Sequence, residues 1–249
     1  MTSSTFKCLR QNTASGRVLR RCRLMGVLCG AGWAALFGSA VVAAALTAPI
    51  ALGAETGLIA TPDARQATSW IRVTGDHHGQ AFAIIDKKAA TLHVFDAAGV
   101  LRGSSLVLLG LAVGDDSVPG IGERKMSDIR PEERTTPAGR FVSEPGRNLQ
   151  GDDIVWIDYN AAVSMHRVRS TNKADRRLQR LASLMPDDHR ISYGCVNVPA
   201  AFYDALVKPM LGSTPGVIYV LPETRPVGTI LGAVNGAPPN AGRYAAKPF

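Results

Sequence analysis

The sequence predicts a mainly β domain with short helices, preceded by an N-terminal hydrophobic helix. Short runs rich in β-branched and aromatic residues begin at Ala81 and recur, between turn residues, as far as Pro222. Helical periodicity is confined to short stretches around them. Residues 24–54 carry no charge. With 249 residues, 46% of them apolar, the chain can form a sizeable core, which excludes disorder throughout.

Residues 1–54 are predicted to be a signal peptide or a signal anchor. Six basic residues and no acidic one precede the uncharged run. That run exceeds the roughly 7–15 apolar residues of an ordinary signal peptide and reaches the roughly 17–25 of a membrane span. Small residues at 51–54 would suit signal peptidase. We therefore expect the rest of the chain to be exported to the periplasm or cell envelope, released there or anchored in the cytoplasmic membrane.

The net charge of +8 belongs mostly to this N-terminal segment. Residues 1–54 hold six of the 28 basic residues and none of the 20 acidic ones, which leaves a net charge of +2 for the remainder. A nucleic-acid-binding domain would need a basic face within the folded part. We therefore expect no nucleic-acid partner.

The first half of the folded part is predicted to be a helix followed by a β-meander. In the lead-in segment, residues 55–80, Pro62 can open a helix that ends near Val73. Strand-like runs follow at 81–86 and 91–96, and a third extends to residue 113. Residues 114–134 are rich in Gly, Pro and charged side chains, which predicts a long exposed loop.

The second half is predicted to alternate short strands and helices. Residues 153–159 and 161–168 have the composition of strands, and leucines at helical spacing predict a helix within 172–185. Asn197 can cap a second helix that begins at Pro199 and ends before Gly212. The segment 216–222 is predicted to be a closing strand, and 223–249 a flexible tail rich in Gly, Pro and Ala.

Cys195 is the single cysteine after residue 29. In an exported domain an unpaired thiol indicates a nucleophile or an intermolecular bridge, although an inert core cysteine is also possible. The predicted helix after Cys195 would offer its dipole and free N–H groups to a thiolate or an oxyanion. Gly194 would let the backbone approach a substrate closely.

Five histidines could supply a general base, and composition alone ranks them loosely: His77, His78, His93, His166 and His189. None of them stands at a zinc-site spacing from Cys195, which lacks a second thiol nearby. We therefore expect no metal and no other cofactor.

Three segments together resemble the L,D-transpeptidase catalytic domain, also called the YkuD family. They are TTPAGRF (135–141), the strand-borne His166 and RISYGCVNV (190–198). The resemblance covers roughly residues 81–222 and implies a β-sandwich of mixed sheets with short helices. It also implies that Cys195 is the nucleophile and His166 the general base. Ser192, Tyr193, Gly194 and Asn197 would form the surrounding motif, with backbone N–H groups holding the oxyanion.

The implied substrate is a peptidoglycan stem tetrapeptide. Cys195 would displace the terminal D-Ala and form a thioester, which an amine acceptor then resolves in cell-wall cross-linking or remodelling. Water as the acceptor would make the protein an L,D-carboxypeptidase, and a D-amino acid would make it an exchange enzyme. Arg190, beside the motif, is expected to bind a substrate carboxylate.

Two features depart from the family pattern. Tyr193 replaces the usual histidine, and a ring without positive charge near neutral pH cannot assist the thiolate as an imidazolium would. The 25 residues between His166 and Ser192 also form a longer spacer than is usual. The substitution leaves a second interpretation open, a non-catalytic envelope protein that binds peptidoglycan through a degenerate site.

Overall fold

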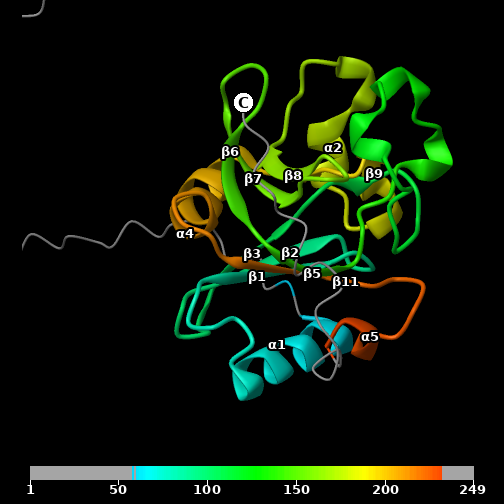
Figure 1. The fold of residues 1–249 in the computed structure, drawn as a ribbon. Coiled ribbons are helices and arrows are strands. Elements are labelled where there is room, and N and C mark those ends of the chain that lie inside the picture. The colour runs from blue at the N-terminus through cyan, green and yellow to red at the C-terminus, as the bar shows by residue number, and fades with distance from the viewer. Residues whose placement is uncertain (1–57, 59, 232–249) are drawn as a thin grey trace, which may run out of the picture. The chain divides into compact units, whose positions relative to one another are not determined.

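The computed structural model describes residues 58 and 60–231. A five-stranded sheet contains strands from both ends of this region (Figure 1). The predicted N-terminal hydrophobic helix lies outside the described residues. Within them, no helix is long and apolar enough to cross a membrane. The sheet has five strands in the order β3 (Leu101–Leu106), β2 (Thr91–Phe95), β1 (Phe82–Asp86), β11 (Val217–Leu221) and β5 (Gly139–Val142).

The two central strands of this sheet are its most deeply buried. β1 and β11 pair in parallel, and the other neighbours pair antiparallel. Alternate residues of β1 point to opposite faces: Ala83 and Ile85 enter the main core, whereas Phe82 and Ile84 enter an outer core. Burial on both faces explains why these strands are almost continuously apolar in sequence.

Helices cover the outer face of this sheet (Figure 1). α1 (Pro62–Thr74) begins as expected, with Thr61 accepting a hydrogen bond from the backbone N–H of Ala64, and it packs Ala67 and Ile71 against the sheet. α5 (Gly228–Leu231) buries Leu231 beside it. The first residues of the expected flexible tail are therefore packed, and residues 232–249 lie outside the described region.

A second sheet covers the inner face and completes a sandwich. Its order is β10 (Val196–Val198), β8 (Val163–Arg167), β7 (Asp153–Asp158) and β6 (Glu144–Arg147). β10 and β8 are parallel, and the remaining pairs are antiparallel. A short parallel pair, β4 (Leu109–Gly110) and β9 (Arg190–Ser192), leads into it. The fold is therefore the mainly β arrangement of mixed sheets with short helices that the sequence predicts.

The remaining helices are short. The helix expected from Pro199 begins at Ala200 instead, and Tyr203, Val207 and Leu211 on it close one side of the main core. It runs as α3 (Ala200–Phe202), a π-helical turn η6 (Tyr203–Val207) and α4 (Lys208–Leu211). Pro209 accounts for the irregularity, because proline cannot donate the hydrogen bond that a regular helix needs.

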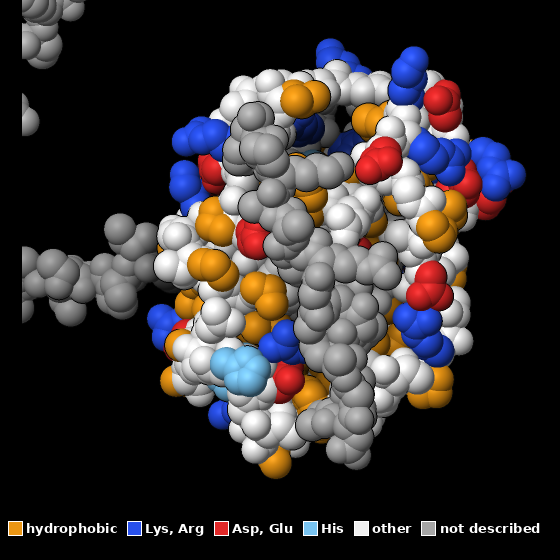
Figure 2. Space-filling model, in the orientation of Figure 1, with side chains coloured by type: hydrophobic (Ala, Val, Ile, Leu, Met, Phe, Trp, Pro, Cys, Tyr) orange, Lys and Arg blue, Asp and Glu red, His pale blue; other side chains and the backbone are white. Residues whose placement is uncertain are grey.

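The helix expected within 172–185 is broken into pieces. Arg176 has a positive φ of 53°, which separates η4 (Lys173–Asp175) from α2 (Arg177–Leu181), and η5 (Pro186–His189) follows. The loop before β5 is likewise not featureless, since it contains η1 (Ile121–Glu123), η2 (Met126–Asp128) and η3 (Pro131–Glu133). Basic and acidic side chains are intermixed on the face drawn in Figure 2.

Candidate active site

The turn Tyr193–Cys195, here called the Cys195 turn, joins β9 to β10. β10 pairs in parallel with β8, with Asn197 opposite His166. On β8, Val163 and Met165 enter the core, so the residues that alternate with them, Ser164 and His166, face the other side. The sheet register therefore brings the cysteine beside the histidine that the sequence favoured.

Cys195 is partly exposed, and its sulfur lies among polar groups. The backbone N–H of Ser164 points at Sγ from 3.4 Å, and the Ser164 hydroxyl is 3.6 Å away. On the other side, the thiol lies 3.6 Å from the carbonyl oxygen of Ala162. The thiol is therefore neither sealed in an apolar pocket nor paired in a disulfide.

His166 is oriented toward this thiol by its own backbone. Its Nδ1 lies 2.8 Å from the carbonyl oxygen of Arg167, and because a carbonyl only accepts, Nδ1 must carry a proton. Nε2 is then the free acceptor of the neutral ring. Burial of the sulfur alone would raise the pKa of the Cys195 thiol. Hydrogen bonding to His166, the positive charge that its ring carries once it has taken the thiol proton, and a further hydrogen bond from Ser164 outweigh burial and lower that pKa below its ordinary value.

Ser192 and Asn197 fix the backbone of the Cys195 turn. The carbonyl oxygen of Cys195 accepts hydrogen bonds from Ser192 Oγ at 2.6 Å and from Asn197 Nδ2 at 3.2 Å. Ser192 Oγ also accepts from the N–H of Gly194 at 3.0 Å. The other two backbone N–H groups of the turn belong to Tyr193 and Cys195, and no hydrogen bond from either is found within the described residues.

Gly194 is required by the close approach of another segment. Its φ is 129°, and a Cβ there would lie 2.7 Å from the carbonyl oxygen of Thr135. Beside it, Thr136 Oγ1 donates to the carbonyl oxygen of Gly194 at 2.9 Å and accepts from the N–H of Gly110 at 2.9 Å. The TTPAGRF segment therefore packs against the Cys195 turn and holds it through these contacts.

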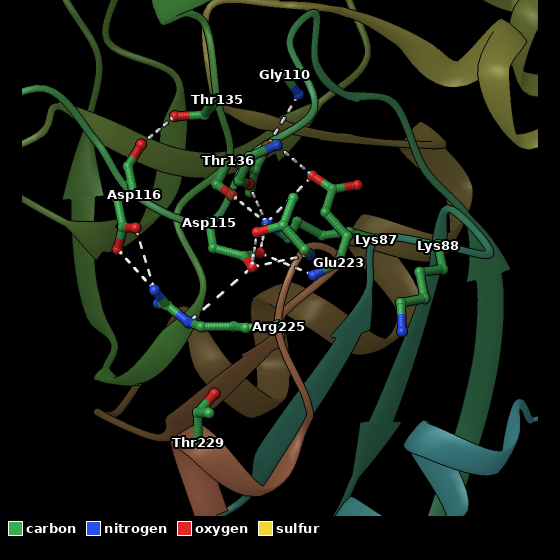
Figure 3. Close-up of polar contacts among 12 residues, drawn as sticks. Lys87, Lys88, Gly110, Asp115, Asp116, Thr135, Thr136, Glu223, Arg225 and Thr229 are labelled. Carbon is green, nitrogen blue, oxygen red and sulfur yellow. Dashed lines mark hydrogen bonds and ion pairs between the residues drawn. The ribbon is translucent and has the colours of Figure 1, made fainter.

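A buried group of ions lies next to this segment, and we call Lys87, Asp115, Arg190 and Glu223 the Lys87 cluster. Figure 3 shows the contacts among Lys87, Asp115 and Glu223. The fully buried Lys87 Nζ lies 2.8 Å from Asp115 Oδ1, 3.3 Å from Glu223 Oε1 and 2.9 Å from the carbonyl oxygen of Thr136. Burial opposes ionisation of Asp115, yet hydrogen bonds from Lys87 and from residues 223–224 hold the pKa of its carboxyl well below the usual range.

Arg190 belongs to this cluster. Its guanidinium donates to the Glu223 carboxylate and, at 3.1 Å, to the carbonyl oxygen of Lys87. Only 11% of the side chain is exposed. The substrate-binding role expected for Arg190 stays a prediction, and the contacts just described are all to groups of the protein itself.

The helix dipole expected to act on Cys195 is not available. The helix begins at Ala200, and β10 separates it from the cysteine. The other histidines are engaged elsewhere. His189 contacts the carbonyl oxygens of Val107 and Ser183 at 2.9 and 3.0 Å, His93 bonds to Ser104 at 2.7 Å, His77 faces a loop carbonyl, and His78 is exposed.

Several residues of the site had no sequence signal. Ser164 and Ala162 contact the sulfur only because of the sheet register, and Arg177 reaches Asn197 Oδ1 at 2.7 Å from the long spacer. The guanidinium of Arg134 lies 3.9 Å from the centre of the Tyr193 ring.

His166 also borders a pocket of about 410 Å³, whose other walls are Asn148, Asp152, Asp153, Arg167, Val168 and Arg169. Among the described residues, no three His, Cys, Asp or Glu side chains gather as metal ligands would.

Comparison with solved structures gives distant matches to L,D-transpeptidases. An L,D-transpeptidase from Mycobacterium smegmatis is 17% identical over 57% of this chain and 58% of its own, with a TM-score of 0.32. The catalytic domain of the E. faecium L,D-transpeptidase is 16% identical over 58% of this chain and 99% of its own, with a TM-score of 0.31. The helical cell shape determining protein Pgp2 from Campylobacter jejuni is 14% identical over 63% and 55%, with a TM-score of 0.37.

This chain spans a little more than half the length of the M. smegmatis and C. jejuni proteins. No protein-family model matches the sequence, and no curated protein matches it. At these identities the likeness is one of fold alone.

Proposed function

We propose that this protein is an exported peptidoglycan L,D-transpeptidase with Cys195 as nucleophile and His166 as general base. The observation that carries the proposal is the juxtaposition of Cys195 and His166 across the paired strands β10 and β8, where the imidazole lowers the pKa of the thiol and its Nδ1 is already occupied. An inert core cysteine would have neither a basic partner nor contact with solvent.

Acylation follows from this geometry. Nε2 of His166 takes the thiol proton, and the thiolate attacks the carbonyl carbon of the L,D-amide before the terminal D-Ala. The N–H groups of Tyr193 and Cys195 stabilise the oxyanion of the tetrahedral intermediate. The intermediate collapses as His166 returns the proton to the amide nitrogen, so the C–N bond breaks, D-Ala leaves and a thioester remains on Cys195.

Deacylation reverses the sequence with a new nucleophile. An acceptor amine loses a proton to Nε2 as it attacks the thioester carbon, the C–S bond breaks, and His166 reprotonates the thiolate. Attack by water gives the L,D-carboxypeptidase reaction from the same intermediate. Contacts with the acceptor therefore decide which product forms.

The test is to incubate the full chain with purified sacculi or a stem tetrapeptide and to analyse both products and enzyme. We expect tripeptides, 3→3 cross-linked muropeptides and a mass increase on Cys195 equal to the tetrapeptide less D-Ala. Cys195→Ala should abolish all three, and Cys29→Ala, the matched control, should not. Products from Cys195→Ala would refute the assignment of the nucleophile. Retention of sacculi by the wild type without any product would favour the non-catalytic binding protein.

Export is part of the same proposal. The basic N-terminus and the uncharged run at 24–54 support it. Sequencing the N-terminus of the protein from envelope fractions distinguishes a cleaved signal from an anchor. Finding the chain in the cytoplasm alone would contradict export.

A further inference from the structure

Residues 134–136 lie directly along the Cys195 turn. The Thr135 carbonyl oxygen occupies the space that a Cβ on Gly194 would need, and Thr136 bonds to the Gly194 carbonyl oxygen. Arg134 precedes these two threonines, at the end of η3. Its side chain therefore starts from backbone that is fixed against the turn carrying the nucleophile.

The Arg134 guanidinium is held over an aromatic ring. It lies 3.9 Å from the centre of the Tyr193 ring, within the range of a cation–π contact. Nε and Nη2 donate to the carbonyl oxygen of Ile129 at 3.3 and 3.1 Å. Nη1 has no hydrogen-bond partner in the described part of the chain. The group is oriented, but its donors are not all used.

Within the described residues, the Arg134 guanidinium is in no ion pair that brings a carboxylate oxygen within 4.0 Å. Three other arginines near the site differ in this respect, because Arg167, Arg177 and Arg190 are each ion-paired. A partly buried, permanently charged guanidinium with open donors suits a planar anion such as a carboxylate.

We propose that Arg134, stacked on Tyr193, binds the carboxylate of the leaving amino acid. This inference rests on the proposed function. In a tetrapeptide stem that carboxylate is two bonds from the nitrogen that departs, so it must lie close to the thiol during attack. Tyr193 is two residues from Cys195, which brings the guanidinium to the same neighbourhood.

The first test requires no peptide. Cys195 of the full chain, with the N-terminal cysteines replaced, is alkylated by neutral iodoacetamide and by anionic iodoacetate. Arg134→Met should lower the iodoacetate rate relative to the iodoacetamide rate by about three- to tenfold, as expected for one charge at close range. The rate ratio cancels any change in thiol pKa. Arg102→Met, which removes an exposed charge on β3, should leave the ratio unchanged. An unchanged ratio in Arg134→Met would overturn the inference.

The second test uses tetrapeptides that end in a free carboxylate or in an amide. Arg134→Met should raise KM for the free acid by about tenfold and leave KM for the amide unchanged, whereas Arg134→Lys should restore part of the loss. Turnover with equal KM values in wild type and Arg134→Met would defeat the role of Arg134 but not the transpeptidase proposal. A shifted alkylation ratio without any turnover would defeat the transpeptidase proposal but support an anion site at Arg134.

Discussion

The Lys87 cluster and the Cys195 turn are both polar, but their groups are partnered to different extents. Lys87 is fully buried, and its ammonium faces two carboxylates and backbone carbonyl oxygens. Cys195 is partly exposed, and no hydrogen bond from the backbone N–H of Tyr193 or Cys195 is found among the described residues. Thr136 belongs to both, because its carbonyl oxygen contacts Lys87 and its hydroxyl contacts Gly194. Completely partnered buried ions hold the fold, whereas the chemistry that we propose requires groups that are not completely partnered.

The largest expected effect on stability comes from Lys87→Met. Removing the ammonium leaves Asp115 and Glu223 buried without it, so the free energy of unfolding should fall by about 3–5 kcal/mol. Lys88→Met is the matched control, because Lys88 is half exposed in a surface ion pair with Asp63, and its loss should cost less than about 1 kcal/mol. Denaturant unfolding of the full chain measures both. Equal losses in the free energy of unfolding would mean that the Lys87 cluster stabilises the fold no more than a surface ion pair does.

His166→Ala should affect reactivity and leave stability nearly unchanged. Without the imidazole, burial would dominate and raise the pKa of the Cys195 thiol, so less thiolate would exist at neutral pH. Alkylation by iodoacetamide at neutral pH should slow by about 10- to 100-fold and recover at alkaline pH. The exposed His78 provides the control, as His78→Ala should leave the rate–pH profile in place. Superimposable profiles for all three proteins would disprove the pairing of Cys195 with His166.

Thr136→Val tests the link between the two regions. The change keeps the shape of the side chain but removes the hydroxyl, which leaves the N–H of Gly110 without its acceptor and the carbonyl oxygen of Gly194 without its donor. We expect a loss of about 1–2 kcal/mol in the free energy of unfolding, with a fall in kcat/KM. Thr136→Ser keeps the hydroxyl and should retain most of both. If Val and Ser behave alike, the hydrogen bonds do not hold the turn.

Tyr193→His should have the smallest effect. A protonated imidazole beside the turn would lower the pKa of the Cys195 thiol by less than about one unit, because Tyr193 is partly exposed. The rate of thiol alkylation against pH, measured for wild type, Tyr193→His and Tyr193→Phe, detects the shift. Identical profiles for wild type and Tyr193→His would mean that a charge at position 193 does not change the pKa of the Cys195 thiol.

Much of the fold could be predicted from local pattern. Apolar and β-branched runs located β1, β2, β7, β8 and β11, and the Thr61–Pro62 pair marked the start of α1. The three-residue strands β9 and β10 could not be found, because they are too short to show periodicity and owe their form to pairing with distant strands. Pro199 is the N-cap of the following helix, which begins at Ala200.

The residues of the candidate site likewise comprise some with a local sequence signal and some without one. Residue chemistry and the motif predict Cys195 and His166 as the reactive pair, and the pairing of β10 with β8 brings the two residues together. Ser164, Ala162 and Arg134 approach the turn through long-range packing, which spacing along the sequence cannot express. Arg190 shows the converse, since its position beside the motif indicated nothing about its partner Glu223, 33 residues further along the chain.

The pairing of β1 with β11 has a consequence for timing. β1 can pair with β11, and Lys87 can bind Glu223, only after residues 217–223 are present at the folding site. The contacts that support Thr136 and Gly194 are therefore complete only when nearly the whole domain is present. A chain threaded unfolded through a membrane would carry an unassembled, weakly acidic thiol during its passage. Its sulfur would gain the contacts with His166 and Ser164 that lower the thiol pKa only after the domain has folded.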